Sequence, residues 1–315
     1  MEPLRGKKIR GNWATLLLPI EPDESIDYQA LEQEIDVLIE IEVDGIYSNG
    51  TAGEFYTQRE EEFDRIHSLL ATKCNRADMP FQIGATHMSA QIALDRLERA
   101  AAYEPSAIQV ILPDWSPVNR DEIIRFLNDM AAAADPIGLV LYNPPYAKTE
   151  LTPAEFGELS EVVTGLEGVK VSPSGRDWYR EFRNNAPDLS LFIPGHELAT
   201  GYMLGADGSY SNIACLSPVG AQSWFGLMES DIESALKLEQ KIQTFLEDYI
   251  EPFITEQQYS NQAVDKLLAA IGDWAPIGTR LRWPYNWIPQ EEVSRLRPVA
   301  KRAMPEFYKL VKRQI

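Results

Sequence analysis

The feature of this sequence that most constrains its fold is a regular alternation of short apolar segments with amphipathic ones. Strands are predicted where β-branched, aliphatic and aromatic residues run between turn residues, at 13–19, 45–49, 81–85, 107–112, 137–143, 168–172, 190–194 and 208–214. Apolar residues recur at helical spacing between them, at about 27–42, 57–73, 89–103, 120–134, 153–163, 176–185 and 197–204. Eight strands that alternate with helices indicate a parallel sheet. Eight is also the number that closes a (β/α)8 barrel.

The sequence therefore predicts an α/β protein: a (β/α)8 TIM barrel catalytic domain over residues 1–225 and a C-terminal helical appendage over residues 226–315. Beyond residue 225 the strand signals stop and three amphipathic helical segments follow. No low-complexity linker precedes them, so we expect the appendage to pack on the barrel. An open doubly wound sheet is the alternative. That fold favours a glycine-rich phosphate turn after the first strand, and residues 19–26 (PIEPDESI) contain no glycine.

The charge balance excludes some classes of partner. The chain has 29 basic and 48 acidic residues, a net charge of −19, so it lacks the basic excess that nucleic acid or an anionic membrane requires. No stretch approaches the roughly 18 apolar residues of a membrane span. The apolar run near the N-terminus contains Pro19 and leads into acidic residues, so we interpret it as the first strand and not as a signal peptide. Cys74 and Cys215 fall in elements that we expect to be packed, which predicts reduced thiols and a cytoplasmic protein.

One lysine is out of place in this pattern. Lys170 lies within GVKVS, the predicted sixth strand, where a bare ammonium in a covered sheet costs several kcal/mol unless it is paired or loses its proton. Active sites of such barrels lie at the carboxyl ends of the strands. If Lys170 points inward, a neutral amine there is a nucleophile towards carbonyl carbon. The alternative is that Lys170 points outward and extends past a helix to solvent.

Four short motifs follow one another along the chain: GTAGE at 50–54, YNPP at 142–145, GVK at 168–170 and GADGSYS at 205–211. In this order and spacing the sequence resembles the dihydrodipicolinate synthase and N-acetylneuraminate lyase family. Members of that family are class I, Schiff-base aldolases on a (β/α)8 barrel with a C-terminal helical region. The resemblance spans nearly the whole chain, and it favours the inward orientation of Lys170.

The resemblance implies catalytic roles for Lys170, Tyr142 and Thr51. Lys170 would attack the ketone carbon of pyruvate or another 2-oxo acid, and the protonated imine would act as an electron sink while a C–C bond to an aldehyde is made or broken. Tyr142 would relay protons, unless it is simply a buried tyrosine with a satisfied hydroxyl. Backbone N–H groups of the 50–53 turn would hold the carboxylate, unless this is a plain tight turn. We expect Glu54 to anchor this loop and not to act in catalysis. The implied substrate-binding residues are Gly50, Ala52, Gly53, Trp115, Gly195 and Tyr210.

The chain also departs from the family pattern, mainly on the side that would hold the aldehyde. Ala52 replaces a second hydroxyl residue in the glycine turn. Trp115 replaces the second of two tyrosines that in the synthases reaches the site of a neighbouring subunit, and an indole cannot relay a proton as a phenol does. Ala147 replaces a carboxylate-binding arginine, and the neighbouring Lys148 is not an equivalent planar fork. These changes predict that the chain is not a true dihydrodipicolinate synthase. Trp115 indicates the hydratase-aldolase branch and an apolar or aromatic aldehyde.

Other chemistries have little support in the sequence. The three histidines, His67, His87 and His196, are isolated, and no paired His or Cys spacing predicts a metal site. We therefore expect no metal and no cofactor. The expected partners are a small-molecule 2-oxo acid and an aldehyde, together with further copies of the chain, since the resemblance implies a homotetramer of paired dimers. The alternative function is a catalytically impaired barrel that binds a small 2-oxo acid or serves regulation.

Overall fold

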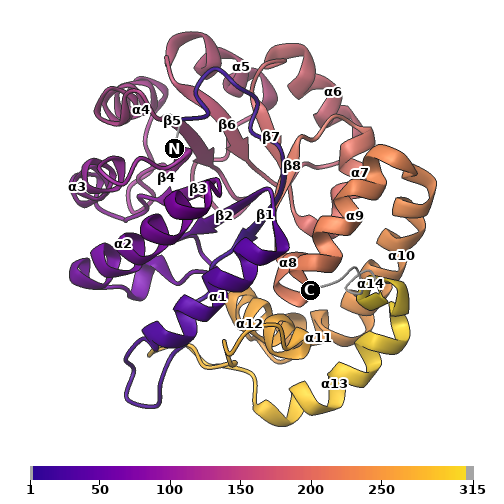
Figure 1. Cartoon of the computed structure of the whole chain (residues 1–315). Coiled ribbons are helices and arrows are strands. Elements are labelled where there is room, and N and C mark those ends of the chain that lie inside the picture. The colour runs from indigo at the N-terminus through magenta and orange to yellow at the C-terminus, as the bar shows by residue number, and fades with distance from the viewer. Residues whose placement is uncertain (1–2, 310–315) are drawn as a thin grey trace.

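Eight parallel strands pair in sequence order and close into a barrel in the computed structural model, which describes residues 3–309 (Figure 1). The strands are β1 (Gly11–Thr15), β2 (Gly45–Ser48), β3 (Phe81–Gly84), β4 (Ala107–Ile111), β5 (Gly138–Tyr142), β6 (Leu166–Lys170), β7 (Ser190–Phe192) and β8 (Gly208–Ser211). Hydrogen bonding between β1 and β8 completes the ring. The predicted TIM barrel is confirmed, and the open doubly wound sheet is wrong.

Helices cover the outside of the barrel and connect consecutive strands (Figure 1). They are α1 (Tyr28–Ile41), α2 (Glu60–Ala77), α3 (Ala90–Ala101), α4 (Arg120–Ala134), α5 (Pro153–Val162), α6 (Arg176–Asn185) and α7 (Leu198–Met203), with short 3-10 turns η1 (Phe55–Thr57) and η2 (Gly195–Glu197). Their starts follow from local chemistry. Thr152, for example, caps α5 in a reciprocal pair with Glu155, and Pro153 occupies the first turn.

Two of the predicted strands extend three or more residues beyond their observed ends. The first strand ends at Thr15 and not at residue 19, because beyond it the amide of Leu17 donates to the buried carboxylate of Glu34 on α1 and not to a neighbouring strand. The eighth strand ends at Ser211 and not at residue 214. There the Ser211 hydroxyl accepts from the amide of Ala214 and starts a short helix, α8 (Asn212–Leu216).

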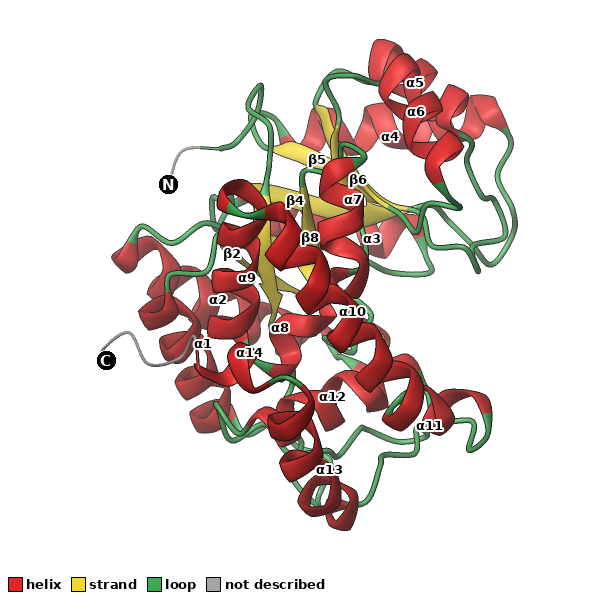
Figure 2. Cartoon of the chain, turned by 90° about the vertical axis from the view of Figure 1, so that its right-hand side faces the viewer, coloured by secondary structure: helices red, strands yellow, loops and turns green. Residues whose placement is uncertain are grey.

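The C-terminal third of the chain is helical, as expected, and gathers on one side of the barrel (Figure 2). It contains α9 (Pro218–Ser230), α10 (Ile232–Tyr249), α11 (Glu251–Thr255), α12 (Asn261–Gly272), α13 (Gln290–Ala303) and α14 (Pro305–Lys309). Two of the three expected helical segments are each divided into two helices, α10 and α11 at Pro252 and α13 and α14 at Pro305. The division of the chain between residues 225 and 226 falls inside α9 and stays a prediction. Over residues 3–309, no helix is long and apolar enough to cross a membrane.

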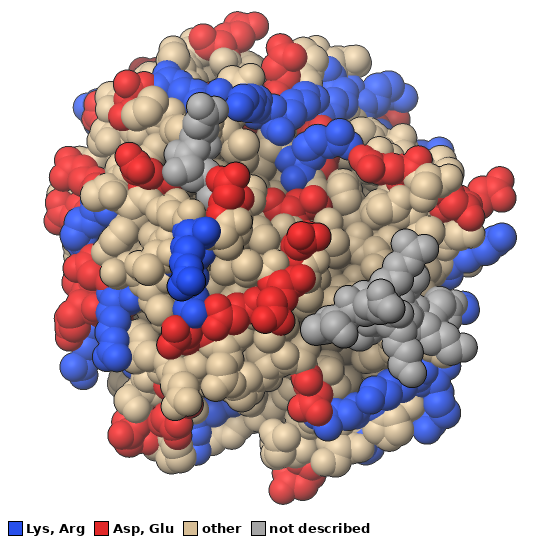
Figure 3. All heavy atoms as spheres, viewed as in Figure 1, with Lys and Arg blue, Asp and Glu red and all other residues tan. Residues whose placement is uncertain are grey.

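The barrel interior and the surrounding shell form two apolar clusters. The shell cluster joins the outer faces of the strands to the helices. The interior cluster is small and aromatic, and its buried members are Ile9, Trp13, Tyr47, Ala107, Val140, Phe192 and Tyr210. On the surface, acidic and basic side chains lie side by side on the face that Figure 3 shows.

One buried ion pair ties the C-terminal helices to the barrel. The Lys266 ammonium on α12 lies 2.6 Å from the carboxylate of Glu54, and both side chains are completely buried. Glu54 follows the 50–53 turn in a left-handed backbone conformation, with φ of 53°. Its other oxygen accepts from the amide of Arg282, in the connector that precedes α13. The expectation that Glu54 anchors this turn agrees with these contacts.

We predict that Lys266→Met lowers the free energy of unfolding by about 3–5 kcal/mol, because it leaves the Glu54 charge buried without compensation. The double variant Glu54→Gln/Lys266→Met should recover part of that loss, since it removes both charges. Urea unfolding at one fixed protein concentration measures both values. Equal losses in the single and double variants would contradict the prediction.

Candidate active site

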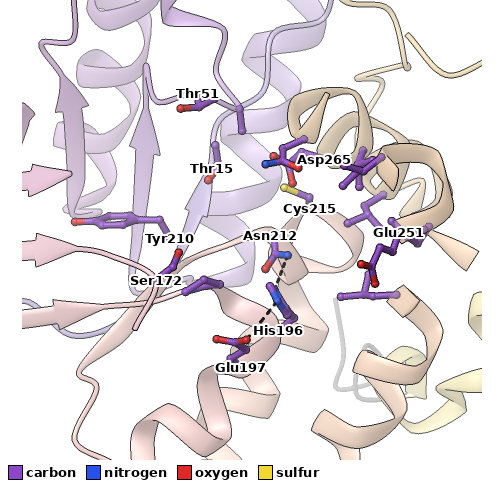
Figure 4. Close-up of a pocket in the computed structure, with 18 of the residues that line it drawn as sticks. Thr15, Thr51, Ser172, His196, Glu197, Tyr210, Asn212, Cys215, Glu251 and Asp265 are labelled. Atoms are coloured by element: carbon purple, nitrogen blue, oxygen red, sulfur yellow. Dashed lines mark hydrogen bonds and ion pairs between the residues drawn. The ribbon is translucent and has the colours of Figure 1, made fainter. Parts of the chain in front are cut away.

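A cavity of about 760 Å³ opens at the carboxyl ends of the strands, between the barrel and the helices that follow it (Figure 4). This is the end of the barrel at which TIM-barrel active sites lie. The barrel side contributes Thr15, Tyr47, Thr51, Ala52, Tyr142, Lys170 and Tyr210. The opposite side contributes His196, Glu197, Asn212, Cys215, Glu247, Glu251 and Asp265. Five of the nine predicted site residues therefore line this cavity: Lys170, Thr51, Ala52, Tyr142 and Tyr210.

Lys170 is the last residue of β6, and the strand geometry directs it inward. Gly168 pairs with Val140, a member of the interior cluster, and Lys170 lies two residues further on the same face. Its ammonium lies 4.3 Å from the ring centroid of Tyr142 and 5.2 and 5.5 Å from those of Tyr47 and Tyr210. The outward orientation that the sequence left open does not occur.

Burial lowers the pKa of Lys170 from its ordinary value of 10.5 to about 8, although the carboxylate of Asp265 acts in the opposite direction. The three rings around the amine offer π faces but no full negative charge to hold the proton. A substantial fraction of the side chain is therefore a neutral amine near neutral to mildly alkaline pH. Such an amine is a nucleophile towards carbonyl carbon.

Tyr142 ends β5, and its pairing with Lys170 across the strands holds the phenol beside the amine. Its hydroxyl lies 3.0 Å from that of Tyr146 and is hydrogen-bonded to the side chain of Thr51. Burial, more than the neighbouring tyrosines, raises the pKa of Tyr142 well above its usual value, so the phenol holds its proton. The side chain is thus a proton donor next to the amine, connected by hydrogen bonds on two sides.

The predicted glycine turn divides into residues that line the cavity and residues that shape the backbone. Thr51 and Ala52 line the cavity. Gly50 and Gly53 do not, but a Cβ at Gly50 would overlap the Tyr47 hydroxyl, and one at Gly53 would approach the amide nitrogen of Asn49 to 3.1 Å. Only glycine permits this close packing of the turn on the strand end.

Two other predicted residues lie outside the cavity lining. A Cβ at Gly195, in η2, would collide with the side chains of Ser211 and Asn212, so this glycine lets the turn pack against the end of β8. Trp115, in the loop after β4, is 82% exposed. The Lys148 ammonium donates to the Trp115 carbonyl and lies 5.3 Å from the indole centroid, so Lys148 also points away from the cavity.

The sequence reasoning missed three residues of the site. Tyr47 is inward-facing and buried, and its hydroxyl accepts from Gln109 at 2.5 Å. Strict alternation along β2 would have placed it in the interior.

Asp265 on α12 and Cys215 on α8 lie near each other in the cavity wall (Figure 4). Burial raises the pKa of Asp265 to about 7, against the lowering effect of Lys170, and raises that of the Cys215 thiol well above its usual value. Two adjacent charged residues, Asp265 and Lys266, interrupt an apolar helical stretch of the sequence, and this pattern could have indicated a functional role for Asp265.

His196 is the one histidine at the cavity, and it acts as a polar wall residue in this geometry. Its Nδ1 lies 3.1 Å from the Asn212 side-chain nitrogen, and its Nε2 lies 4.0 Å from the Glu197 carboxylate (Figure 4). His67 is buried on α2, where its Nε2 lies 3.0 Å from the Ser48 hydroxyl. Within residues 3–309, no three His, Cys, Asp or Glu side chains group as metal ligands would.

A barrel with an inward lysine on β6 and a tyrosine beside it defines a class of Schiff-base enzymes, and comparison with known proteins identifies the family. The sequence profile of the Dihydrodipicolinate synthetase family matches residues 8–302. The chain belongs to this family and is a class I aldolase or lyase. The family resemblance drawn from the four motifs is confirmed.

The individual relatives carry different names. The chain is 27% identical to the N-acetylneuraminate lyase of Rhizobium meliloti over 204 residues, which cover 64% of this chain and 67% of that one. It is 29% identical to the 4-hydroxy-tetrahydrodipicolinate synthase of Methanothermobacter thermautotrophicus over 238 residues, 73% and 83% of the two chains. Its fold is similar to that of YagE, a prophage protein of E. coli K12 whose crystal structure contains pyruvate. That comparison gives a TM-score of 0.81, 21% identity and coverage of 94% and 98%.

The lowered pKa of Lys170 predicts the pH dependence of imine formation with pyruvate. The amine is protonated and unreactive below about pH 8, so the rate should rise with pH through that value and level off above it. Asp265→Asn removes a carboxylate that raises this pKa, and the midpoint should move to lower pH. Samples taken over time at each pH and quenched into borohydride at one alkaline pH give the rates.

Glu251→Gln is the matched control for that experiment, because Glu251 also lines the cavity but is not among the groups that shift the pKa of Lys170. Its midpoint should equal that of the unmodified protein. A midpoint near 10.5 in the unmodified protein, or the same midpoint in Asp265→Asn, would show that burial and Asp265 do not set the pKa of this amine.

Proposed function

We propose that Lys170 attacks the ketone carbon of pyruvate or another 2-oxo acid and forms an imine, and that the enzyme then makes or breaks a C–C bond to an aldehyde. The observation that carries this proposal is the position of the Lys170 amine. It lies in the cavity, surrounded by three tyrosine rings, with its pKa lowered to about 8 by burial. The protonated imine withdraws electrons from C3 of the 2-oxo acid, which stabilises the carbanion that reacts with the aldehyde.

The remaining barrel-side residues have roles in this proposal that follow from their positions. Tyr142 donates a proton to the ketone oxygen as the amine attacks, since its phenol stays protonated beside Lys170. Thr51 is hydrogen-bonded to Tyr142 and lines the same cavity wall. The backbone N–H groups of the 50–53 turn bind the carboxylate of the 2-oxo acid, with Tyr210 packed against the amine from the other side.

In this proposal the opposite wall of the cavity contacts the aldehyde and influences which aldehyde binds. Glu197, Glu247, Glu251 and Asp265 line it, and Lys170 is the one lysine or arginine among the described lining residues. Once Lys170 has formed the imine, a carboxylate on the aldehyde would find several carboxylates and no guanidinium among these lining residues. We therefore propose an aldehyde without a carboxylate and weak activity as a dihydrodipicolinate synthase. The apolar or aromatic aldehyde, and with it the hydratase-aldolase branch, rests on Trp115 and stays a prediction.

The proposal includes a cytoplasmic homo-oligomer. Both cysteines are free and buried, which fits a reducing compartment. The family resemblance implies a homotetramer of paired dimers. Size-exclusion chromatography with light scattering measures the oligomeric state directly.

We predict that Lys170→Ala abolishes trapping of pyruvate by borohydride and leaves the fold intact, because a methyl group in place of the amine removes a costly buried charge. Mass spectrometry of the unmodified protein should find one reduced pyruvyl adduct on Lys170. The control is Lys148→Ala, which removes an exposed lysine outside the cavity and should trap normally. An adduct on another lysine in Lys170→Ala would refute the assignment. Absence of any adduct in the unmodified protein would favour the binding or regulatory alternative.

We also predict that a carboxylate on the aldehyde lowers activity. Betaine aldehyde and 3,3-dimethylbutanal have the same shape, differ by one positive charge and lack a carboxylate, and both should outperform succinate semialdehyde and aspartate semialdehyde, which each carry one. Loss of a bidentate carboxylate partner is worth a few kcal/mol, a factor of tens to hundreds in kcat/KM. Pyruvate consumption with each aldehyde gives the ranking. If aspartate semialdehyde is the best of the four, the chain is a synthase despite Ala147.

A further inference from the structure

A second phenol contacts Tyr142, and nothing in the proposed chemistry so far uses it. Tyr146 lies four residues further along, in the loop after β5, and its hydroxyl is 3.0 Å from that of Tyr142. Tyr146 lines the cavity, yet 62% of the residue is exposed. Its hydroxyl thus connects the proton donor beside Lys170 to the edge of the cavity.

Tyr142 needs such a connection for turnover. Its phenol faces the cavity floor, and burial keeps its pKa far above the working pH, so a phenolate left after proton donation is unstable and must be reprotonated quickly. Tyr142 is also hydrogen-bonded to Thr51, whose aliphatic hydroxyl is a much weaker acid than a phenol and so a poorer proton donor. On the outer side its hydrogen-bonded neighbour is Tyr146.

We infer that Tyr146 is a positioning and proton-relay residue that passes protons between solvent and Tyr142 within one chain. This inference rests on the proposed function of Lys170. The three hydroxyls of Thr51, Tyr142 and Tyr146 form one hydrogen-bonded row from the glycine turn to the surface of the protein. A row of hydroxyl groups transfers a proton by moving each hydrogen one bond along, with no movement of the side chains.

The proton count of imine formation shows what the relay supplies. The Lys170 amine forms a bond to C2 of pyruvate, the C=O electron pair moves to oxygen, and this oxygen takes the Tyr142 proton. Tyr142 takes the proton of Tyr146, and Tyr146 takes one from water. The carbinolamine nitrogen has meanwhile lost a proton to solvent. A second proton then passes along the same row to the hydroxyl group, the C2–O bond breaks, and water leaves. The net reaction is amine plus ketone plus one proton giving protonated imine plus water.

The same relay acts when only pyruvate is present, which makes it testable without the second substrate. The imine loses a proton from C3 to give an enamine and regains one from solvent. In deuterium oxide the pyruvate methyl group therefore exchanges its hydrogens, and proton NMR follows the loss of its signal. The variants are Tyr146→Phe and, as the reference for loss of the inner phenol, Tyr142→Phe. The control is Tyr249→Phe, which removes a partly exposed phenol on α10 outside this cavity.

Tyr146→Phe should slow methyl exchange by about 10- to 100-fold, below the roughly 10²- to 10⁴-fold expected for Tyr142→Phe, because water replaces Tyr146 imperfectly. Imidazole added to Tyr146→Phe should restore much of the rate, since the site of the lost hydroxyl is open to solvent. Tyr146→His, which keeps an exchangeable donor and acceptor, should also retain much of it. Tyr249→Phe should exchange normally. Borohydride trapping on Lys170 should reach the same final extent in Tyr146→Phe as in the unmodified protein.

Two results would overturn the relay. Normal exchange in Tyr146→Phe would show that solvent reaches Tyr142 by another path. Slow exchange that neither imidazole nor Tyr146→His restores would assign Tyr146 a purely structural role. Circular dichroism of each variant checks that it is folded, and the His variant provides the test if Phe is not tolerated. Failure of the unmodified protein to trap pyruvate is a different result, because it refutes the Schiff base itself.

Discussion

The arrangement of the site depends on the buried ion pair between Glu54 and Lys266. Glu54 follows the glycine turn on the barrel side, and Lys266 adjoins Asp265 on α12. The pair therefore sets the position of the turn relative to the helix that supplies Asp265. Since both side chains have no exposed surface, either charge without the other would be expensive, and the two elements can only dock together. The C-terminal helices thus complete the active site and do not merely decorate the barrel.

Burial also lowers the pKa of Lys170, whose surroundings differ from those of Lys266. The Lys266 Nζ lies 2.6 Å from the Glu54 carboxylate, whereas the rings around the Lys170 amine offer a weaker, diffuse attraction. Burial lowers the pKa of both lysines, but at Lys266 the neighbouring carboxylate opposes it at hydrogen-bond distance. Burial thus acts on both lysines, and the carboxylate at hydrogen-bond distance distinguishes the paired Lys266 from Lys170.

The two walls of the cavity differ in chemical character, which fits a reaction with two substrates. The barrel wall consists of residues that surround Lys170, and it contains residues of all four short motifs of the sequence. The opposite wall consists of side chains from η2, α8 and α10–α12, with four carboxylates among the residues that line the cavity. Relatives named as lyases and as synthases match the chain about equally well, so family membership defines the reaction type and the opposite wall bears on the aldehyde.

The sequence by itself determined the barrel, because each strand and helix is encoded locally. The periodicity of two or of 3.6 residues, a helix cap such as Thr152 or Ser89 and the turn residues each act within one strand–helix unit of about 30 residues. The place of Lys170, Tyr142 and Thr51 at the cavity could also be predicted, since each lies at the carboxyl end of its strand, where such barrels place their chemistry. The strand ends were less certain, as β8 shows: the capping hydroxyl of Ser211 ends the strand inside an apolar run.

Only the tertiary structure decided which distant residues complete the site. Asp265 is 95 positions from Lys170, and its approach depends on how α12 docks, which no local pattern encodes. The contact between Tyr142 and Tyr146 depends on the path of the loop after β5, and the same loop carries Lys148 to the Trp115 carbonyl and away from the cavity. The pKa of Lys170 required three-dimensional information for the same reason. Desolvation is the summed effect of every atom that excludes water from the amine, and most of those atoms belong to residues far away in the chain.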